Sequence, residues 1–258
     1  MRDLSYQLYS SRNHTPLEST LRMLRHAGYK QVEGYQGLFP SQEAAQQLRD
    51  MLDANELSMP TCHFDLETLI NEPGDVIAHA KTLGVRAVIA PYLNKESRPV
   101  DRASWEAFGL QLHQASKPFL DAELKFGWHN HGFEFAWTAP SERAIDVILA
   151  TAPKIQLELD IGWATLAGVD LIEFIKCHAG RLIAAHIKDT SMLGCGEFED
   201  DADCWVNVGS GIIQWEPVLQ ELVRAHTAYF VLEHDNPEND CIFCRKSLEH
   251  VSSIFKLI

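Results

Sequence analysis

Short apolar runs alternate with longer amphipathic stretches along the whole chain. The apolar runs are typical of buried strands and the amphipathic stretches of helices. Strands are predicted over residues 4–9, 29–33, 57–63, 85–91, 155–160, 182–188 and 229–233, with one more beginning at Phe126. Helices are predicted over residues 15–27, 41–54, 75–83, 102–122, 141–151, 171–179, 215–226 and 240–255, with a long loop over residues 190–211.

This alternation predicts an α/β fold with a parallel sheet, because strands joined through helices run in the same direction. Eight strand and helix pairs in 258 residues close most economically as a (β/α)8 TIM barrel. An open doubly wound sheet is the alternative, but no Gly-x-Gly-x-x-Gly follows the first strand, which weakens its dinucleotide-binding form. No segment reads as a linker, so residues 1–258 are expected to form one domain.

Polar side chains stand where four successive apolar runs end. Residues 126–135 read Phe-Gly-Trp-His-Asn-His-Gly-Phe-Glu-Phe, and the next three runs close on Asp160, His186 and Glu233. Since the carboxyl ends of barrel strands meet at one mouth, Glu134, Asp160, His186 and Glu233 are expected to converge. Three carboxylates and one imidazole make a plausible site for a divalent metal.

Two more polar residues end earlier strands. Glu33 closes the second predicted strand and His63 the third. A single carboxylate or imidazole at a strand end is more often a cap or a loop hydrogen bond than a functional group. Several of them at successive strand ends are harder to explain by capping alone.

The charge of the chain narrows the class of partner. The formal net charge is -14, with 22 Lys and Arg against 36 Asp and Glu. Nucleic acid is therefore not expected as a partner, because binding to phosphate backbones rests on clustered basic residues. No window is apolar enough to cross a membrane, and a cytoplasmic protein that does not bind membranes is expected.

Five motifs resemble the xylose-isomerase-like TIM barrels, in particular their sugar phosphate isomerase/epimerase group. They are Trp128-His-Asn-His-Gly-Phe-Glu-Phe135, Leu157-Glu-Leu-Asp-Ile-Gly-Trp163, His186-Ile-Lys-Asp189, Val208-Gly-Ser-Gly-Ile-Ile-Gln-Trp215 and Val231-Leu-Glu-His-Asp235. The resemblance covers the whole chain and is strongest after residue 124. It implies a metal-dependent isomerase or epimerase acting on a small-molecule keto sugar or polyol-derived ketone.

The resemblance implies metal ligands at Glu134, Asp160, His186 and Glu233. The fifth-strand ligand is the open one, because in some relatives an acidic residue stands where this chain has His129. Glu134 is preferred, since the His-Asn-His-x-x-Glu form itself occurs in the family. A further departure is Asn207, where relatives often have an acidic residue or histidine.

Oxygen-rich coordination with one imidazole suits Mn2+ best, with Mg2+, Co2+ or Zn2+ as alternatives. Such an ion stabilises charge as an ene-diolate develops beside the carbonyl. Glu134 and Glu233 are predicted to be the acid and base that move the proton.

The remaining candidates are predicted to contact the substrate or to orient a ligand. They are Glu33, His63, His129, His131, Trp163 and Lys188. Gly209-Ser-Gly211 reads equally well as a turn into the helix at Trp215 and as a phosphate loop, so a phosphorylated substrate is not predicted.

Three other functions stay open. A dehydratase of the keto-inositol or dehydroshikimate type would use the same site and the same first proton abstraction. A metal-dependent abasic-site endonuclease shares the barrel but needs a basic groove, and the net charge speaks against it. A non-catalytic sugar-binding barrel is the third. The family resemblance also implies pairing of the chain into a homo-oligomer.

Overall fold

The computed structural model describes residues 2–191 and 204–258. Eight parallel strands form a closed barrel, in which each strand pairs with its neighbour in chain order and the first pairs with the last. This confirms the predicted TIM barrel. The strands are β1 (Ser5–Gln7), β2 (Gln31–Tyr35), β3 (Ser58–His63), β4 (Ala87–Ala90), β5 (Lys125–His129), β8 (Gln156–Asp160), β9 (Leu182–Ile187) and β12 (Tyr229–Leu232).

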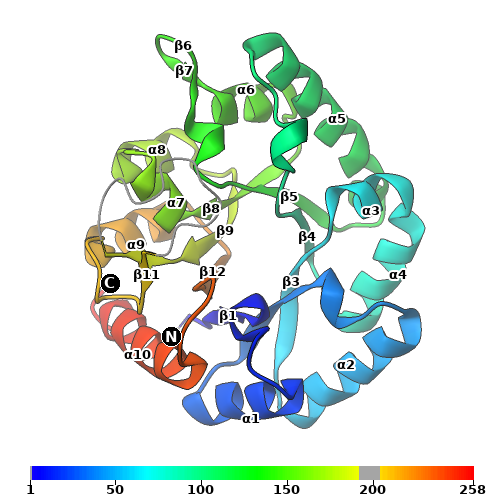
Figure 1. The fold of residues 1–258 in the computed structure, drawn as a ribbon, viewed down its shortest axis with the longest axis vertical. Coiled ribbons are helices and arrows are strands. Elements are labelled where there is room, and N and C mark those ends of the chain that lie inside the picture. The colour runs from blue at the N-terminus through cyan, green and yellow to red at the C-terminus, as the bar shows by residue number, and fades with distance from the viewer. Residues whose placement is uncertain (1, 192–203) are drawn as a thin grey trace.

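Helices surround the barrel, as Figure 1 shows. Those that follow the eight strands are α1 (Leu17–Ala27), α2 (Gln42–Ala54), α4 (Pro73–Leu83), α5 (Arg102–Asp121), α6 (Ala144–Thr151), α8 (Leu171–Cys177), α9 (Trp215–Arg224) and α10 (Asp240–Phe255). Their ends follow local chemistry. The Ser41 side chain caps α2 by accepting from the Ala44 N–H at 3.1 Å, and Gly28, with φ of 109°, ends α1 in the left-handed region.

Additional short elements lie between the strands and the main helices. They are the helices α3 (Leu66–Asn71) and α7 (Ile161–Leu166), the 3-10 helices η1 (Leu8–Ser11), η2 (Gln36–Leu38), η3 (Lys95–Ser97) and η4 (Phe133–Phe135), and the strand pairs β6 (Trp137–Ala139) with β7 (Glu142–Arg143) and β10 (Asp189–Thr190) with β11 (Trp205–Val206). None of them was predicted as a separate element. Residues 192–203 of the expected 190–211 loop lie outside the described residues.

Strand alternation divides the side chains of the sheet into two sets. On β8, Leu157 and Leu159 belong to the large apolar core, while Glu158 and Asp160 belong to the other face of the strand. On β5, Trp128 is in that core and His129 is not. The apolar core therefore fills the layer between barrel and helices, and the barrel interior receives polar side chains.

The strand register sets the depth of these polar side chains. Asp160 pairs with His186 across β8 and β9, and His129 pairs with Glu158 across β5 and β8.

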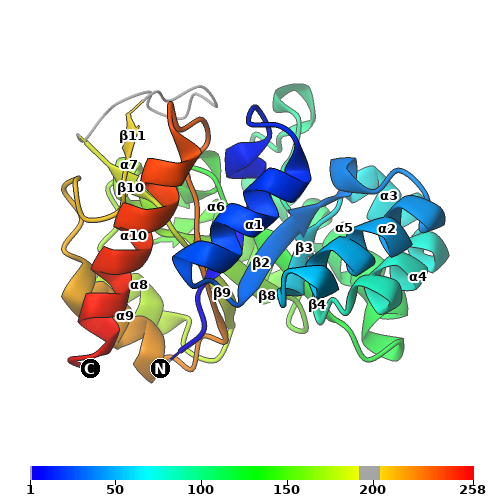
Figure 2. The same ribbon diagram turned by 90° about the horizontal axis from the view of Figure 1, so that it is seen from below.

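In Figure 2 the chain termini lie at one end of the barrel, and the β10 and β11 pair lies at the other. No helix among the described residues is long and apolar enough to span a membrane.

Candidate metal centre

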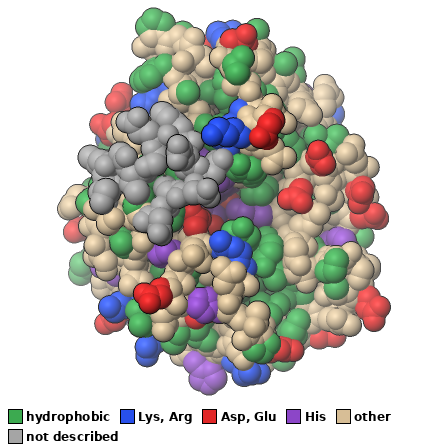
Figure 3. Space-filling model, viewed as in Figure 1, with side chains coloured by type: hydrophobic (Ala, Val, Ile, Leu, Met, Phe, Trp, Pro, Cys, Tyr) green, Lys and Arg blue, Asp and Glu red, His purple; other side chains and the backbone are tan. Residues whose placement is uncertain are grey.

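A cavity of about 660 Å³ opens at the carboxyl ends of the barrel strands. Figure 3 shows a hollow in the middle of this face, with histidine and acidic side chains inside it and basic side chains beside it. Residues from several barrel strands line the cavity, among them His63, His129, Lys188 and Glu233. Of the four residues expected to converge at the mouth, Glu233 lines this cavity.

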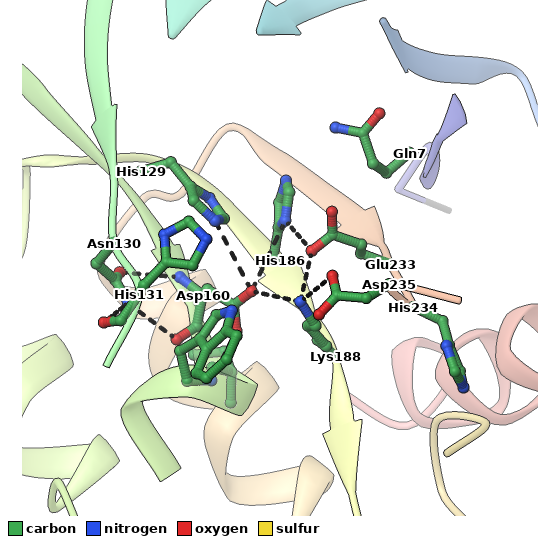
Figure 4. Close-up of polar contacts among 12 residues, drawn as sticks. Gln7, His129, Asn130, His131, Asp160, His186, Lys188, Glu233, His234 and Asp235 are labelled. Carbon is green, nitrogen blue, oxygen red and sulfur yellow. Dashed lines mark hydrogen bonds and ion pairs between the residues drawn. The ribbon is translucent and has the colours of Figure 1, made fainter. Parts of the chain in front are cut away.

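Three carboxylates surround one ammonium group at the top of the site, and we call Asp160, Lys188, Glu233 and Asp235 the upper layer. Lys188 Nζ lies 2.6 Å from Asp235 Oδ1, 3.3 Å from Glu233 Oε2 and 3.6 Å from Asp160 Oδ2. Figure 4 shows the lysine between these side chains. Asp160 ends β8, whereas the other three residues follow the ends of β9 and β12.

The imidazoles of His186 and His129 lie directly below the upper layer. In each ring one nitrogen faces a carboxylate of that layer and the other faces a deeper carboxylate. His186 Nδ1 lies 2.7 Å from Glu233 Oε2, and its Nε2 lies 2.6 Å from Glu33 Oε1. His129 Nε2 lies 3.9 Å from Asp160 Oδ2, and its Nδ1 lies 3.2 Å from Glu158 Oε2. Each ring thus joins an upper carboxylate to a deeper one.

Glu33, His63 and Glu158 form a lower layer inside the barrel. His63 Nε2 lies 2.6 Å from Glu158 Oε2 and 3.2 Å from Glu33 Oε1. Gln7 donates from Nε2 to Glu33 Oε1 at 2.8 Å, which fixes that carboxylate from the strand on its other side. Both glutamates are fully buried.

The upper layer carries more negative than positive charge. Burial raises the pKa of Asp160, and the Glu233 charge adds to this, so the pKa is about 7 although Lys188 lowers it. Burial also raises the pKa of Asp235, whereas the charges of His186 and Lys188 hold the pKa of Glu233 well below its usual range despite burial. With all groups ionised, three carboxylates and one ammonium leave two negative charges.

The lower layer balances its own charge. Burial opposes charge on His63, but Glu33 and Glu158 outweigh it and raise the His63 pKa to about 10. The same balance raises the pKa of His186, where Glu158, Glu233 and Glu33 are the charged neighbours. The imidazolium charges in turn lower the pKa of Glu33 and Glu158 against the effect of burial.

Among the described residues, two groups of side chains are close enough to hold a metal ion. One is Asp160, His186 and Glu233, which belong to or adjoin the upper layer. Its fit to a divalent cation rests on two observations: three carboxylates of the upper layer face a single ammonium group, and the buried Asp160 Oδ2 accepts no hydrogen bond from the described residues. The other group is His63, His129, Glu158 and His186.

Residues 21–248 match the model of the family described as xylose isomerase-like TIM barrel. The chain belongs to this family. The predicted family resemblance is thereby confirmed. None of the curated proteins compared with the chain matches it.

Several solved structures share the xylose isomerase-like fold with the chain over nearly their full lengths. A sugar phosphate isomerase/epimerase from Parabacteroides distasonis ATCC 8503 is 17% identical, with a TM-score of 0.78 and coverage of 98% of this chain and 94% of that one. The IolI protein with a bound zinc atom is 18% identical, with a TM-score of 0.79 and coverage of 99% and 98%. The probable 3-DHS dehydratase AsbF from Bacillus anthracis is 13% identical, with a TM-score of 0.78 and coverage of 97% and 98%.

In this xylose isomerase-like barrel, Glu134 lies apart from Asp160, His186 and Glu233. It is fully buried in η4, its Oε1 accepts from Trp128 Nε1 at 3.0 Å, and its Oε2 accepts from the His131 N–H at 2.8 Å. It does not line the mouth cavity and is in neither metal-binding group. Of the two fifth-strand candidates, His129 is the one that faces Asp160.

Aromatic rings form one wall of the mouth cavity in this family member. Trp163 lies against His131 with ring centroids 5.4 Å apart and against Trp205 at 4.8 Å. Lys188 Nζ lies 4.3 Å from the centre of the Trp205 ring, a cation–π contact. Trp163, His131 and Lys188, three of the residues predicted to contact substrate, line the cavity, whereas Glu33 lies below it.

Glu158 and Asp235 are site residues that were not predicted from the sequence. Glu158 precedes Asp160 by two residues, and Asp235 follows Glu233 by two. Residues two apart on a strand share a face, so the period of the strand was a signal for Glu158. Asp235 lies beyond the end of β12, where that period does not decide direction.

The Gly209-Ser-Gly211 turn of this barrel has its backbone donors occupied. The N–H groups of Gly209 and Gly211 donate to Asp189 Oδ2 at 2.8 and 3.2 Å, and Trp215 Nε1 donates to the same oxygen at 2.9 Å. These contacts favour the interpretation as a turn into the Trp215 helix over that of a phosphate loop.

Proposed function

We propose that the protein is a divalent-metal-dependent isomerase or epimerase of a keto sugar or related polyol-derived ketone. The observation that carries the proposal is the buried Asp160 Oδ2, which accepts no hydrogen bond from the described residues and lies beside Glu233 and His186 at the mouth of a xylose isomerase-like barrel. The solved structures with this fold include a sugar phosphate isomerase/epimerase and a protein with a bound zinc atom. The first supports the reaction class, and the second supports the use of a metal.

Asp160, His186 and Glu233 would hold the ion, with His129 as the fifth-strand partner in place of Glu134. His186 would bind through Nδ1 while its Nε2–H donates to Glu33, which fixes the ring orientation. The ion would supply Lewis-acid polarisation of the carbonyl next to the carbon that loses its proton. Two carboxylates with imidazole are compatible with Mn2+, our first choice, and also with Zn2+.

Glu233 is the base in this proposal. It lines the cavity, and its Oε2 lies 3.3 Å from Lys188 Nζ, whose positive charge favours the carboxylate form that can accept a proton from carbon. Lys188 is fixed beside it and can donate a hydrogen bond to a substrate oxygen. His131 stands on the aromatic side of the cavity, and its buried Nδ1 has no partner among the described residues, so it can serve a substrate hydroxyl.

The test is deuterium uptake from D2O into a panel of ketoses and keto-inositols, measured with the metal-loaded protein, after chelation and after refilling with Mn2+ or Zn2+. Uptake into one class of compound that disappears on chelation and returns on refilling is the expected result. Uptake that is insensitive to chelation would reject metal dependence. The absence of uptake from every compound would reject the proposed substrate class.

A dehydratase is the second candidate, favoured by the fold shared with the probable 3-DHS dehydratase. It would begin with the same proton abstraction by Glu233 and then expel a β-hydroxyl. Ultraviolet absorbance of the products distinguishes the two reactions, because elimination gives a conjugated enone and epimerisation does not.

A further inference from the structure

The lower part of the site brings three imidazoles to one carboxylate oxygen. Glu158 Oε2 lies 2.6 Å from His63 Nε2, 3.2 Å from His129 Nδ1 and 3.2 Å from His186 Nε2. The four side chains come from four different strands, β3, β5, β8 and β9, and their ligand atoms all lie within 4.8 Å of one another. This arrangement is deeper than Asp160 and Glu233 and does not include them.

The spacing of these atoms is close to that of a tetrahedral metal site. Zinc binds imidazole nitrogen and carboxylate oxygen at about 2.0–2.2 Å, which puts neighbouring ligand atoms of a tetrahedron about 3.3–3.6 Å apart. Two of the three contacts to Glu158 Oε2 have nearly this length, and the contact from His63 needs to open by less than an ångström. His63 and His129 line the mouth cavity, so an ion has a path to the group.

Two buried oxygens beside the group have no hydrogen-bond partner among the described residues. They are Oε1 of Glu158 and Oε2 of Glu33. Both carboxylates are fully buried, and a buried carboxylate oxygen without a partner is costly. When two of the three rings are protonated, their two positive charges balance the negative charges of Glu33 and Glu158. A divalent ion between neutral imidazoles would supply the same two positive charges.

We propose that His63, His129, Glu158 and His186 form a second metal-binding site, of the three-histidine and one-carboxylate type that suits Zn2+ or Co2+. The site shares His186 with the group of Asp160 and Glu233, and it also includes His129, the fifth-strand partner proposed for that group. A neutral imidazole offers one lone pair, so His186 binds an ion above through Nδ1 or below through Nε2, and the two positions are alternatives. One ion per chain is therefore expected, with its position set by the remaining ligands.

Co2+ alone is the probe, because four-coordinate Co2+ absorbs visible light much more strongly than oxygen-rich six-coordinate Co2+. The metal-free Asp160→Asn variant is titrated with Co2+ and compared with Asp160→Asn/Glu158→Gln and Asp160→Asn/His63→Gln. Asp160→Asn is expected to bind one Co2+ with a strong visible band. Each double variant is expected to lose the band and to bind at least tenfold more weakly.

The matched control is His178→Gln in the Asp160→Asn background, because His178 pairs with Asp146 on the outside of the barrel. It removes one histidine and is expected to leave the Co2+ band unchanged. Folding is followed by thermal unfolding, in which Co2+ is expected to raise the midpoint of Asp160→Asn and of the control but of neither double variant. Failure of Asp160→Asn to bind Co2+, or unchanged binding in a folded double variant, would overturn the proposal.

This proposal and the proposed function fail independently. Loss of substrate exchange in Asp160→Asn with retention of Co2+ supports both the lower site and a catalytic role for the upper group. Retention of exchange in the same variant would reject the upper group as the catalytic centre and leave the lower site in place. Co2+ absorbance requires no substrate, so it is read whether or not the reaction class is correct.

Discussion

Glu233 and Glu134 are the two glutamates predicted to act as a pair, and the structure places them in different surroundings. Glu233 faces Lys188 and His186 at the mouth of the barrel. Glu134 is enclosed beside Trp128, and both of its oxygens accept N–H groups from its own segment. The difference lies in how far each residue is from the end of its strand.

Glu233 directly follows β12, so the alternation of the strand still sets its direction, and Val231 and Glu233 share the inner face. Glu134 follows the end of β5 by five residues and lies in η4, where local turns decide the side-chain direction. A strand pattern therefore predicts direction only as far as the strand continues. For the fifth strand, the residue to which this applies is His129.

The largest expected effect separates the two glutamates by activity. Glu233→Gln is expected to reduce deuterium exchange by about 100-fold or more, because it removes the proposed general base. Glu134→Gln is expected to reduce exchange less than about tenfold, since Glu134 does not line the cavity. Single-turnover exchange measured on both variants with saturating metal gives the comparison.

Metal content is the control for this pair. Glu134→Gln is expected to bind one divalent ion with the wild-type affinity. If Glu134→Gln instead loses both the ion and the exchange, then Glu134 is a ligand as the family resemblance implied, and the two glutamates act as the predicted pair.

A smaller effect is expected on the stability of Glu134→Gln. Glu134 now accepts hydrogen bonds from the Trp128 Nε1–H and from the His131 backbone N–H. The side-chain NH2 of a glutamine would face one of these two donors, and that buried donor would lose its partner. The cost is about 1–3 kcal/mol of unfolding free energy. Urea denaturation of the wild type and the variant near pH 5 measures it, and equal stability there would contradict the hydrogen-bonded role of Glu134.

The stability difference between the wild type and Glu134→Gln is expected to change with pH. Burial raises the pKa of Glu134 to about 8, above its value of about 4.3 in an unfolded chain. A raised carboxyl pKa gives stability that is complete below the unfolded pKa and is lost as the pH rises through the folded pKa. The contribution of Glu134 to the free energy of unfolding of the wild type therefore falls between about pH 4.5 and pH 8. Glutamine does not titrate, so the difference in unfolding free energy between the wild type and Glu134→Gln narrows from pH 5 to pH 9.

The sequence patterns predict the barrel and most of the mouth, and the reason is the strand period. Asp160 and His186 are the last or nearly the last inward residues of β8 and β9, so their strands alone bring them together. Depth inside the barrel was not predicted, because it depends on the register between strands. Glu33 and His63 were expected to contact substrate, yet the register carries Glu33 below the cavity to join Glu158.

The smallest expected effect concerns Asp146, which lies in the first turn of α6. Asp146 Oδ2 accepts from the Arg143 N–H at 3.0 Å at the start of α6, and its Oδ1 lies 3.2 Å from His178 Nε2. Partial burial opposes ionisation, but these two hydrogen bonds outweigh it and lower the pKa of Asp146. Asp146→Asn keeps an acceptor for Arg143 and loses the charge that faces His178.

The Asp146 side chain is 35% exposed, so solvent screens the pair, and Asp146→Asn is expected to cost less than about 1 kcal/mol at pH 7. A lowered carboxyl pKa gives stability that is present above the unfolded pKa of about 3.9 and is lost as the pH falls through the folded pKa. Urea denaturation from pH 7 downward is therefore expected to show the two proteins converging below about pH 4. Exchange at the mouth is expected to be unchanged, because Asp146 acts on the segment outside the barrel. A loss of exchange comparable to that of Glu233→Gln would mean that the position of this outer segment controls the site, and the contrast between the two glutamates would no longer hold.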